Sequence, residues 1–359
     1  MPWPTRESAM SSSRLSGSLR WGIGITGLIL LAALAAPLLA PYGLSEQLDP
    51  VAARYRPPGT VLQAVHLADG RWRLADRVER VAGGLEGNGL ALERLGRREI
   101  LPEAQVLNLT AGGVADRRIF LLGTDKFGRD LWSRMLYGAR VSLAVGMLSV
   151  ALALTLGVAI GSAAALGGPF VDSLLMRTVD ALVAFPFLFL LILLSALFSP
   201  GTGAMILILG SSNWTGISRL TRVEVLGLAR REFAVAARAI GQTPMKILLR
   251  HLLPNALTPI VVRATLLIGN LILLESALSF LGLGIQPPTP TWGNMVAEGR
   301  EALSQGWWIA TFPGAALAVT VIGFNLLADG LRDFLDPRLD LARLDLETRS
   351  DRPAMLPPS

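Results

Sequence analysis

Long uncharged apolar runs constrain this chain more than any other feature of its sequence. A helix needs around 20 apolar residues to span about 30 Å of hydrocarbon. Six runs approach that length: residues 21–40, 141–166, 181–198, 201–218, 258–281 and 307–331. The composition agrees, since only 17% of the 359 residues are charged, against roughly 25% in soluble domains. The sequence therefore predicts an all-α, polytopic membrane protein with six transmembrane helices.

The first run, residues 21–40, has two possible interpretations. Basic residues precede it and small residues follow its apolar core, as in a signal peptide. Its uncharged stretch is longer than a usual signal core, and the rest of the chain is membranous as well. We therefore expect residues 21–40 to be a retained transmembrane helix 1, preceded by a cytoplasmic tail at residues 1–20.

The fourth and fifth runs carry polar side chains where hydrocarbon is expected. In the fourth run these are Ser211, Ser212, Asn213 and Thr215, and in the fifth Arg263, Asn270 and Glu275. Polar groups inside a membrane need partners or water, so they face protein or a pathway instead of lipid. The pathway candidates are Asn213, Trp214, Asn270 and Glu275. A structural hydrogen bond between helices is an equal alternative for each of them.

Charge sets the expected orientation. The loop between the fourth and fifth runs is rich in arginine and lysine: Arg219, Arg222, Arg230, Arg231, Arg238, Lys246 and Arg250. Short basic loops stay in the cytoplasm, and six spans then place both termini there too. Residues 41–138 then fall on the outer side. They are rich in arginine, but segments of this length are translocated largely regardless of charge.

The outer segment has the pattern of a small β-structure. Apolar and polar residues alternate from Val65 to Leu74 around an Asp69-Gly70 turn, which is typical of a hairpin. A second pair of strands is expected within residues 89–101. We therefore predict a β-rich extracytoplasmic insert at about residues 60–118, between transmembrane helices 1 and 2.

Several chemistries are excluded by residue counts. The chain has no cysteine, and its only histidines are His66 and His251, so thiolate and His-rich metal sites are not expected. Lys126 and Lys246 are the only lysines and neither follows a glycine, so a nucleotide-binding P-loop is not expected either. We expect no catalytic residue, no metal and no cofactor in this chain, hence no enzyme. The net charge of +6 fits a cytoplasmic basic loop better than a nucleic-acid partner.

The basic loop contains a helix, a break and a second helix. Residues 232–240 have helical spacing, Gly241 interrupts it, and Pro244 starts another helical stretch. Ala236 and Ala237 lie on the apolar stripe, and small residues let another surface approach closely. Docking to a protein is therefore favoured over an amphipathic helix resting on the inner leaflet.

This stretch resembles the EAA loop of ABC importer permeases. That loop carries Glu-Ala-Ala, three residues, Gly, nine residues and then Ile-x-Leu-Pro. The matching positions here are Val235, Ala236, Ala237, Gly241 and the sequence HLLP at 251–254. Val235 stands in place of the usual glutamate and His251 in place of the isoleucine. Glu232, three residues before Val235, lies on the same helical face.

Four further segments resemble C-type subunits of dipeptide and oligopeptide permeases. They are residues 121–143, 176–186, 277–300 and 325–339, in matching order. The resemblance covers most of residues 121–339. It implies the six-helix type I ABC importer permease (MetI-like) fold, with helices 2–6 in residues 139–339 and the coupling loop at 222–256. A cytoplasmic C-terminal tail at 340–359 follows.

The resemblance also implies a function. The chain is expected to be a subunit of an ATP-driven importer for di- or oligopeptides in the bacterial inner (plasma) membrane. The implied partners are a B-type permease subunit, two ABC ATPase subunits that bind ATP and Mg, an extracytoplasmic substrate-binding protein and the lipid bilayer. The residues implied in ATPase coupling are Glu232, Val235, Ala236, Ala237, Arg238, Gly241, His251 and Pro254. Ala236, Ala237 and Gly241 would dock closely, and Glu232 and Arg238 would form ion pairs.

Two alternatives stay open from the sequence. One is a membrane-anchored, ligand-sensing scaffold without transport, in which the insert binds the ligand. The other keeps the importer architecture but carries nickel or another small solute. The insert interrupts a segment that the resembling family joins directly, so we expect it to contact the substrate-binding protein or to shield the entrance.

Overall fold

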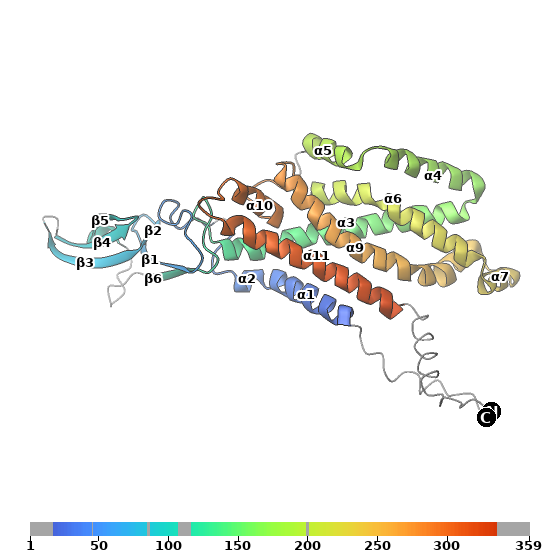
Figure 1. Cartoon of the computed structure of the whole chain (residues 1–359), viewed down its shortest axis with the longest axis horizontal. Coiled ribbons are helices and arrows are strands. Elements are labelled where there is room, and N and C mark those ends of the chain that lie inside the picture. The colour runs from blue at the N-terminus through green and yellow to red at the C-terminus, as the bar shows by residue number, and fades with distance from the viewer. Residues whose placement is uncertain (1–16, 45, 85–86, 107–115, 199–200, 336–359) are drawn as a thin grey trace, which may run out of the picture.

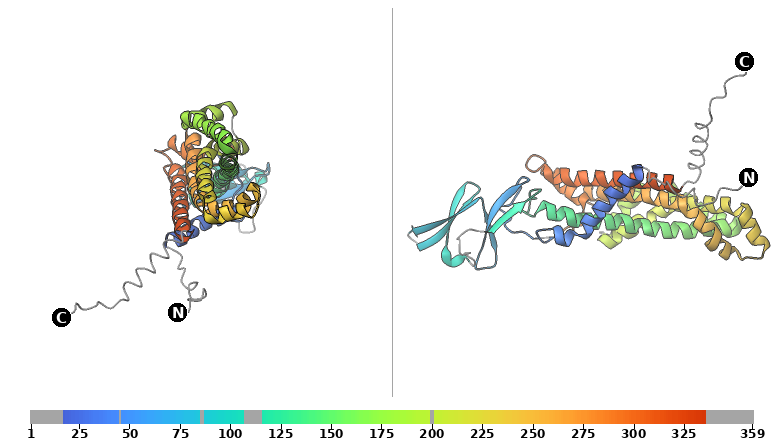
Figure 2. Two further views of the ribbon diagram at one scale, coloured as in Figure 1. Left: turned by 90° about the vertical axis from the view of Figure 1, so that its right-hand side faces the viewer. Right: turned by 90° about the horizontal axis from the view of Figure 1, so that it is seen from below.

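The structure is a computed structural model that describes residues 17–44, 46–84, 87–106, 116–198 and 201–335. Most of the predicted N-terminal tail and all of the predicted C-terminal tail lie outside these residues. Helices gather into an elongated bundle, with strands at one end and the short helix α7 at the other (Figure 1). The right-hand view in Figure 2 shows the same separation from a second direction.

Eleven α-helices build the bundle in the part of the chain that the structure describes. They are α1 (Gly17–Leu34), α2 (Ala36–Leu39), α3 (Leu131–Leu166), α4 (Gly168–Ala184), α5 (Phe187–Phe198), α6 (Thr202–Ala229), α7 (Glu232–Ala239), α8 (Pro244–Ile247), α9 (Leu253–Phe280), α10 (Trp292–Arg300) and α11 (Trp308–Leu335). A π-helical turn, η2 (Leu248–Leu252), joins α8 to α9.

Several of these helices are long and apolar enough to cross a membrane. Four segments qualify: residues 17–34, 131–166, 244–280 and 308–335. The pair α4 and α5 qualifies jointly although it is bent by 82°. The prediction of a helical, multi-pass membrane protein is therefore confirmed. Helix α6 is continuous over 28 residues, but polar residues at 211–215 interrupt its apolar sequence and it is not among the segments that qualify. The count of six spans therefore stays a prediction.

The predicted span at residues 181–198 is bent, because proline divides it into the end of α4 and α5. Helix α4 ends at Ala184, and Phe185 is extended with φ −79° and ψ 133°. Proline disfavours helical geometry in the residue before it, so Pro186 sets this break. Helix α3 begins at Leu131, ten residues before the apolar run at 141–166, because the Asp130 carboxylate accepts the Ser133 N–H at 2.7 Å and caps it.

Glycines allow α3 to lie unusually close to α6. A Cβ atom at Gly161 would stand 2.4 Å from the Ser218 carbonyl oxygen, and one at Gly157 would stand 2.6 Å from Ile217 Cβ. Small residues four apart on one helix face allow this approach between helices in a membrane. The backbone contact at Gly161 leaves no room for a larger residue.

The segment between α2 and α3 folds into two three-stranded antiparallel sheets. The strands are β1 (Thr60–His66), β2 (Trp72–Ala75), β3 (Arg77–Gly84), β4 (Gly87–Arg94), β5 (Arg97–Pro102) and β6 (Asp116–Phe120). Their order is β2-β1-β6 in one sheet and β3-β4-β5 in the other. The β1–β2 hairpin turns at Asp69-Gly70, where the Arg71 N–H donates to Asp69 Oδ1 at 2.9 Å. Thr60 pairs with Phe120, so this β-rich insert begins and ends at the same place.

We predict that Gly161→Leu destabilises the bundle by about 2 kcal/mol or more, because the added side chain must displace backbone of α6. The matched control is Gly227→Leu in α6, since a Cβ atom there meets nothing within 4 Å. The thermal unfolding of both purified variants in lipid nanodiscs measures the difference. Equal melting temperatures for the two variants would contradict the close α3–α6 contact.

Candidate functional site

The basic loop forms a compact element between α6 and α9. Helix α7 ends at Ala239, and Gly241 follows in the left-handed region with φ +80°. Its N–H donates to the Arg238 carbonyl at 2.9 Å, and the Gln242 N–H donates to the Ala237 carbonyl at 3.1 Å. Such a helix end favours glycine because a Cβ atom is strained there. The predicted arrangement of helix, glycine break and helix is what the structure contains, and we call residues 231–256 the coupling element.

One face of α7 packs inward and the other is free. Ala234 and Ala237 are buried in a cluster that also contains Leu248 and Leu252. The opposite side exposes Ala236, together with the large apolar side chains of Phe233, Val235 and Ile240. Ala237 thus packs inside this chain, and of the two alanines only Ala236 is exposed for the expected docking, which stays a prediction. The outward face is larger and more apolar than two alanines would provide.

The polar residues of the coupling element bind mainly within it. Arg238 donates to the backbone carbonyl oxygens of Ala229 and Ala234, so its guanidinium holds α7 to the end of α6 instead of standing free for an ion pair. His251 Nε2 lies 3.2 Å from Gln242 Oε1 and links η2 to the turn after Gly241. Glu232 is exposed and forms no ion pair with any described residue. Pro254 lies exposed in the first turn of α9.

A cavity of about 490 Å³ opens between α4, α5, α6 and α9. The bend at Phe185 and Pro186 forms one wall, and the polar stretch of α6 at residues 211–217 forms another. Asn213 and Trp214 line it, as expected of pathway residues. Its volume falls within the roughly 300–1,000 Å³ of small-molecule sites.

The other two pathway candidates lie elsewhere. Asn270 is exposed on α9 but does not line the cavity, and Glu275 is fully buried, where it accepts the Ser279 hydroxyl at 2.7 Å. Neither residue lies at this cavity, and their pathway roles stay predictions. Arg263 of α9 does line the cavity, and the sequence analysis did not choose it. The available signal was its position as the one basic residue between Leu253 and Phe280.

The coupling element is attached to both polar walls of this cavity. Helix α6 runs from the cavity to Ala229 and leads into α7 after two residues, while η2 continues directly into α9. Two ion pairs fasten α4 to α6: Arg219 to Asp180 at 2.5 Å, and Arg222 to Asp172. The coupling element is therefore joined at both of its ends to helices that line the cavity, α6 and α9.

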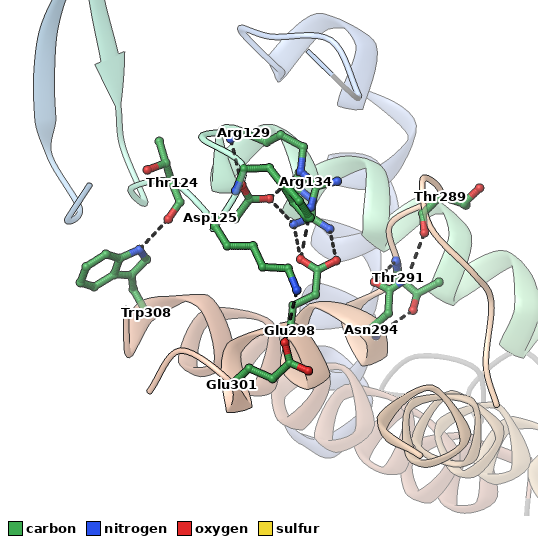
Figure 3. A network of polar contacts seen from close by, with 12 residues as sticks. Thr124, Asp125, Arg129, Arg134, Thr289, Thr291, Asn294, Glu298, Glu301 and Trp308 are labelled. Atoms are coloured by element: carbon green, nitrogen blue, oxygen red, sulfur yellow. Dashed lines mark hydrogen bonds and ion pairs between the residues drawn. The ribbon is translucent and has the colours of Figure 1, made fainter. Parts of the chain in front are cut away.

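A second polar site holds α10 against the start of α3 (Figure 3). Asp125 Oδ2 accepts Arg129 Nε and Arg134 Nη1, each at 2.6 Å. Glu298 of α10 accepts Arg134 Nη1 at 2.7 Å and Nη2 at 3.0 Å. All four side chains are at least largely buried, and we call them the α10 ion cluster. Lys126 and Glu301 form an outer, exposed pair at 3.3 Å.

The remaining contacts of this site are neutral. Trp308 Nε1 donates to the Thr124 carbonyl at 3.1 Å, and Thr291 and Asn294 cap α10 reciprocally. The sequence analysis used the segments at 121–143 and 277–300 only as resemblances. Ion pairs between these two segments connect residues more than 160 positions apart, such as Arg134 and Glu298. No local sequence pattern predicts such pairs.

The described residues thus form a multi-pass helical bundle with a polar cavity and an exposed helical loop at one end. Residues 154–341, more than half of the chain, match the family described as binding-protein-dependent transport system inner membrane component. The chain belongs to this family, as its sequence resemblance indicated. It is thus a transport subunit and not itself an enzyme.

Named relatives match more than half of the chain. The dipeptide transport system permease protein DppC of Alkalihalophilus pseudofirmus is 42% identical, over 60% of this chain and 71% of the relative. The di/tripeptide transport system permease protein DppC of Pseudomonas aeruginosa is 40% identical, over 61% of this chain and 73% of the relative. A chain of the MetNI methionine ABC transporter in inward-facing conformations aligns over 58% of this chain and 95% of its own length, with 20% identity and a TM-score of 0.47.

We predict that Glu298→Gln destabilises the protein by about 3 kcal/mol, because it leaves charge in the buried α10 ion cluster uncompensated. Glu301→Gln is the matched control: it removes the exposed partner of Lys126, and such surface pairs contribute at most about 1 kcal/mol. Thermal unfolding of the purified variants compares the two. Equal destabilisation by both substitutions would show that the cluster is not the main fastening of α10.

Proposed function

We propose that this chain is the C-type membrane subunit of an ATP-driven importer for di- or oligopeptides. Two relatives of 42% and 40% identity carry dipeptide and di/tripeptide permease names, respectively, which supports peptides over nickel or another solute. In this proposal α6, which holds the fourth predicted span, brings the number of spans to six, since its polar residues face the cavity and not lipid. The domain limits at residues 20, 40, 138 and 339 follow from that count.

The observation that carries the proposal is the position of the coupling element. It lies at the end of the bundle opposite the β-rich insert (Figure 1), and it is continuous with two helices that line the cavity. With its basic residues in the cytoplasm, it would meet one of two ATPase subunits, which bind ATP and Mg. This chain supplies no nucleotide site in the proposal. Both termini are then cytoplasmic and the insert lies outside, in the bacterial inner membrane.

The outward face of α7 is the proposed contact with the ATPase. Phe233, Val235 and Ile240 are exposed by 42%, 53% and 75%, which suits burial in an apolar groove. This replaces the ion pairing expected of Glu232 and Arg238. Nucleotide-driven movement of the groove would shift α7, and the attached α6 and α9 would change access to the cavity. A B-type permease would supply the other half of the pathway.

We predict that Ala236→Trp abolishes coupling without unfolding the chain, because residue 236 is exposed on the proposed docking face. ATP-dependent peptide uptake should fall by about tenfold or more, as for a residue at the centre of an interface. Leu197→Trp is the control, since Leu197 is an exposed apolar residue of α5 away from the coupling element. Uptake in proteoliposomes containing the whole importer is the measurement, and full uptake by Ala236→Trp would contradict the docking role.

The β-rich insert is proposed to contact the extracytoplasmic substrate-binding protein. Its ends adjoin, since the Gly59 N–H donates to the Leu121 carbonyl at 3.1 Å, so residues 60–120 can be removed as one unit. We predict that this deletion lowers uptake while the importer still assembles and hydrolyses ATP. Uptake rates and co-purification of the subunits are the measurements. Unchanged uptake by the assembled deletion variant would exclude a role of the insert in delivery.

A further inference from the structure

Arg263 carries a charge inside a membrane-spanning segment. It lies five residues after the first residue of the apolar run at 258–281, in the part of α9 (Leu253–Phe280) that follows the coupling element. Ionisable side chains within a span are costly in free energy and are retained where they pair or line a pathway. Arg263 is the one cation that lines the cavity between α4, α5, α6 and α9.

This charge has no counter-ion among the described residues of the chain. No hydrogen bond or ion pair with another described residue engages Arg263. The acids of α4 are already occupied, because Asp172 binds Arg222 and Asp180 binds Arg219. Glu275, the acid of α9, is fully buried and accepts the Ser279 hydroxyl. Arg263 is exposed, and its guanidinium is therefore open to an anion from outside this chain.

The rest of the cavity complements a solute with both polar and apolar parts. Ser212 Oγ and Asn213 Nδ2 donate to backbone carbonyls of their own helix at 2.7 and 2.8 Å. These bonds hold the two side chains in place and leave the Asn213 carboxamide oxygen as an acceptor. Phe185, Phe187 and Leu190 supply an apolar wall. A cation, an acceptor and an apolar surface together suit a short peptide better than a metal ion.

We propose that Arg263 binds a carboxylate of the passing solute, so that this cavity is a carboxylate subsite in the permease itself. Arginine presents parallel N–H donors that match a carboxylate in a bidentate pair. The proposal rests on the function proposed above and makes it more specific: the cargo has a free carboxyl group, as an unmodified peptide has at its C-terminus. The same chemistry in an acidic side chain of a partner permease is the competing source.

The test compares a peptide with its C-terminal amide in the whole importer. Wild type, Arg263→Gln and Arg140→Gln are reconstituted with the same binding protein and ATPases, and the uptake of each peptide is measured at saturating concentration. Arg140 is an exposed arginine of α3 that does not line the cavity. The acid-to-amide ratio is the uptake of the free-acid peptide divided by the uptake of its amide. Because the same binding protein serves all three permease variants, a change in this ratio reports the permease alone. We expect the ratio to fall about tenfold in Arg263→Gln only, as for one charge-assisted pair.

A chemical rescue gives a second readout, because the chain has no cysteine of its own. Arg263→Cys is treated with a methanethiosulfonate reagent that adds either an aminoethyl or a sulfonatoethyl group, and treated wild type controls for thiols in the partners. The aminoethyl group restores a cation and should restore the acid-to-amide ratio. The sulfonatoethyl group adds an anion and should not.

The outcomes separate the proposals. An unchanged ratio in Arg263→Gln, with uptake retained, overturns the carboxylate subsite. Loss of co-purification with the partner permease, restored by the aminoethyl group with no change in the ratio, assigns the carboxylate to that partner and also overturns it. Absence of ATP-dependent uptake of either peptide by wild type overturns the proposed function itself, before Arg263 enters the comparison.

Discussion

In hydrocarbon, each polar group must find its partner inside the protein, and the architecture of this chain follows from that constraint. Helices satisfy the backbone. The close approach of α3 and α6 at Gly157 and Gly161 supplies packing where no hydrophobic effect acts between helices. At the end of the bundle near the strands, charged side chains pair with one another in the α10 ion cluster. Against this background the polar wall of α6 and Arg263 stand out, because they face a cavity.

In the proposed mechanism, the coupling element transmits the movement of a partner to the cavity. Helix α7 exposes an apolar face to the outside and is fixed on its inner face by Ala234 and Ala237. Arg238 binds the end of α6, and the contact between His251 and Gln242 joins two parts of the element. A partner that moves this element therefore moves a rigid unit. The two helices that leave it line the cavity, so in the proposed mechanism the partner changes access to the cavity without touching the solute.

The sequence predicted the apolar helices, the glycine break at Gly241 and the β-hairpin at Asp69-Gly70, because local periodicity and turn chemistry decide each of them. It did not predict the bend at Pro186 as an interruption, although the proline was visible within the run. It did not predict that Glu275 is fully buried away from the cavity, because burial within the bundle is a tertiary property. The α10 ion cluster was not predicted for the same reason, since Arg134 and Glu298 meet only in the folded chain.

The central claim is that the coupling element and the cavity walls move together. Spin labels at Leu190→Cys in α5 and Leu267→Cys in α9 would lie on facing walls of the cavity. Electron–electron double resonance on the assembled importer measures their distance distribution without nucleotide and with ATP and vanadate. The account predicts that trapping the ATPases in the closed state shifts this distribution, and that Ala236→Trp removes the shift. An identical distribution in both states, with nucleotide demonstrably bound, would contradict it.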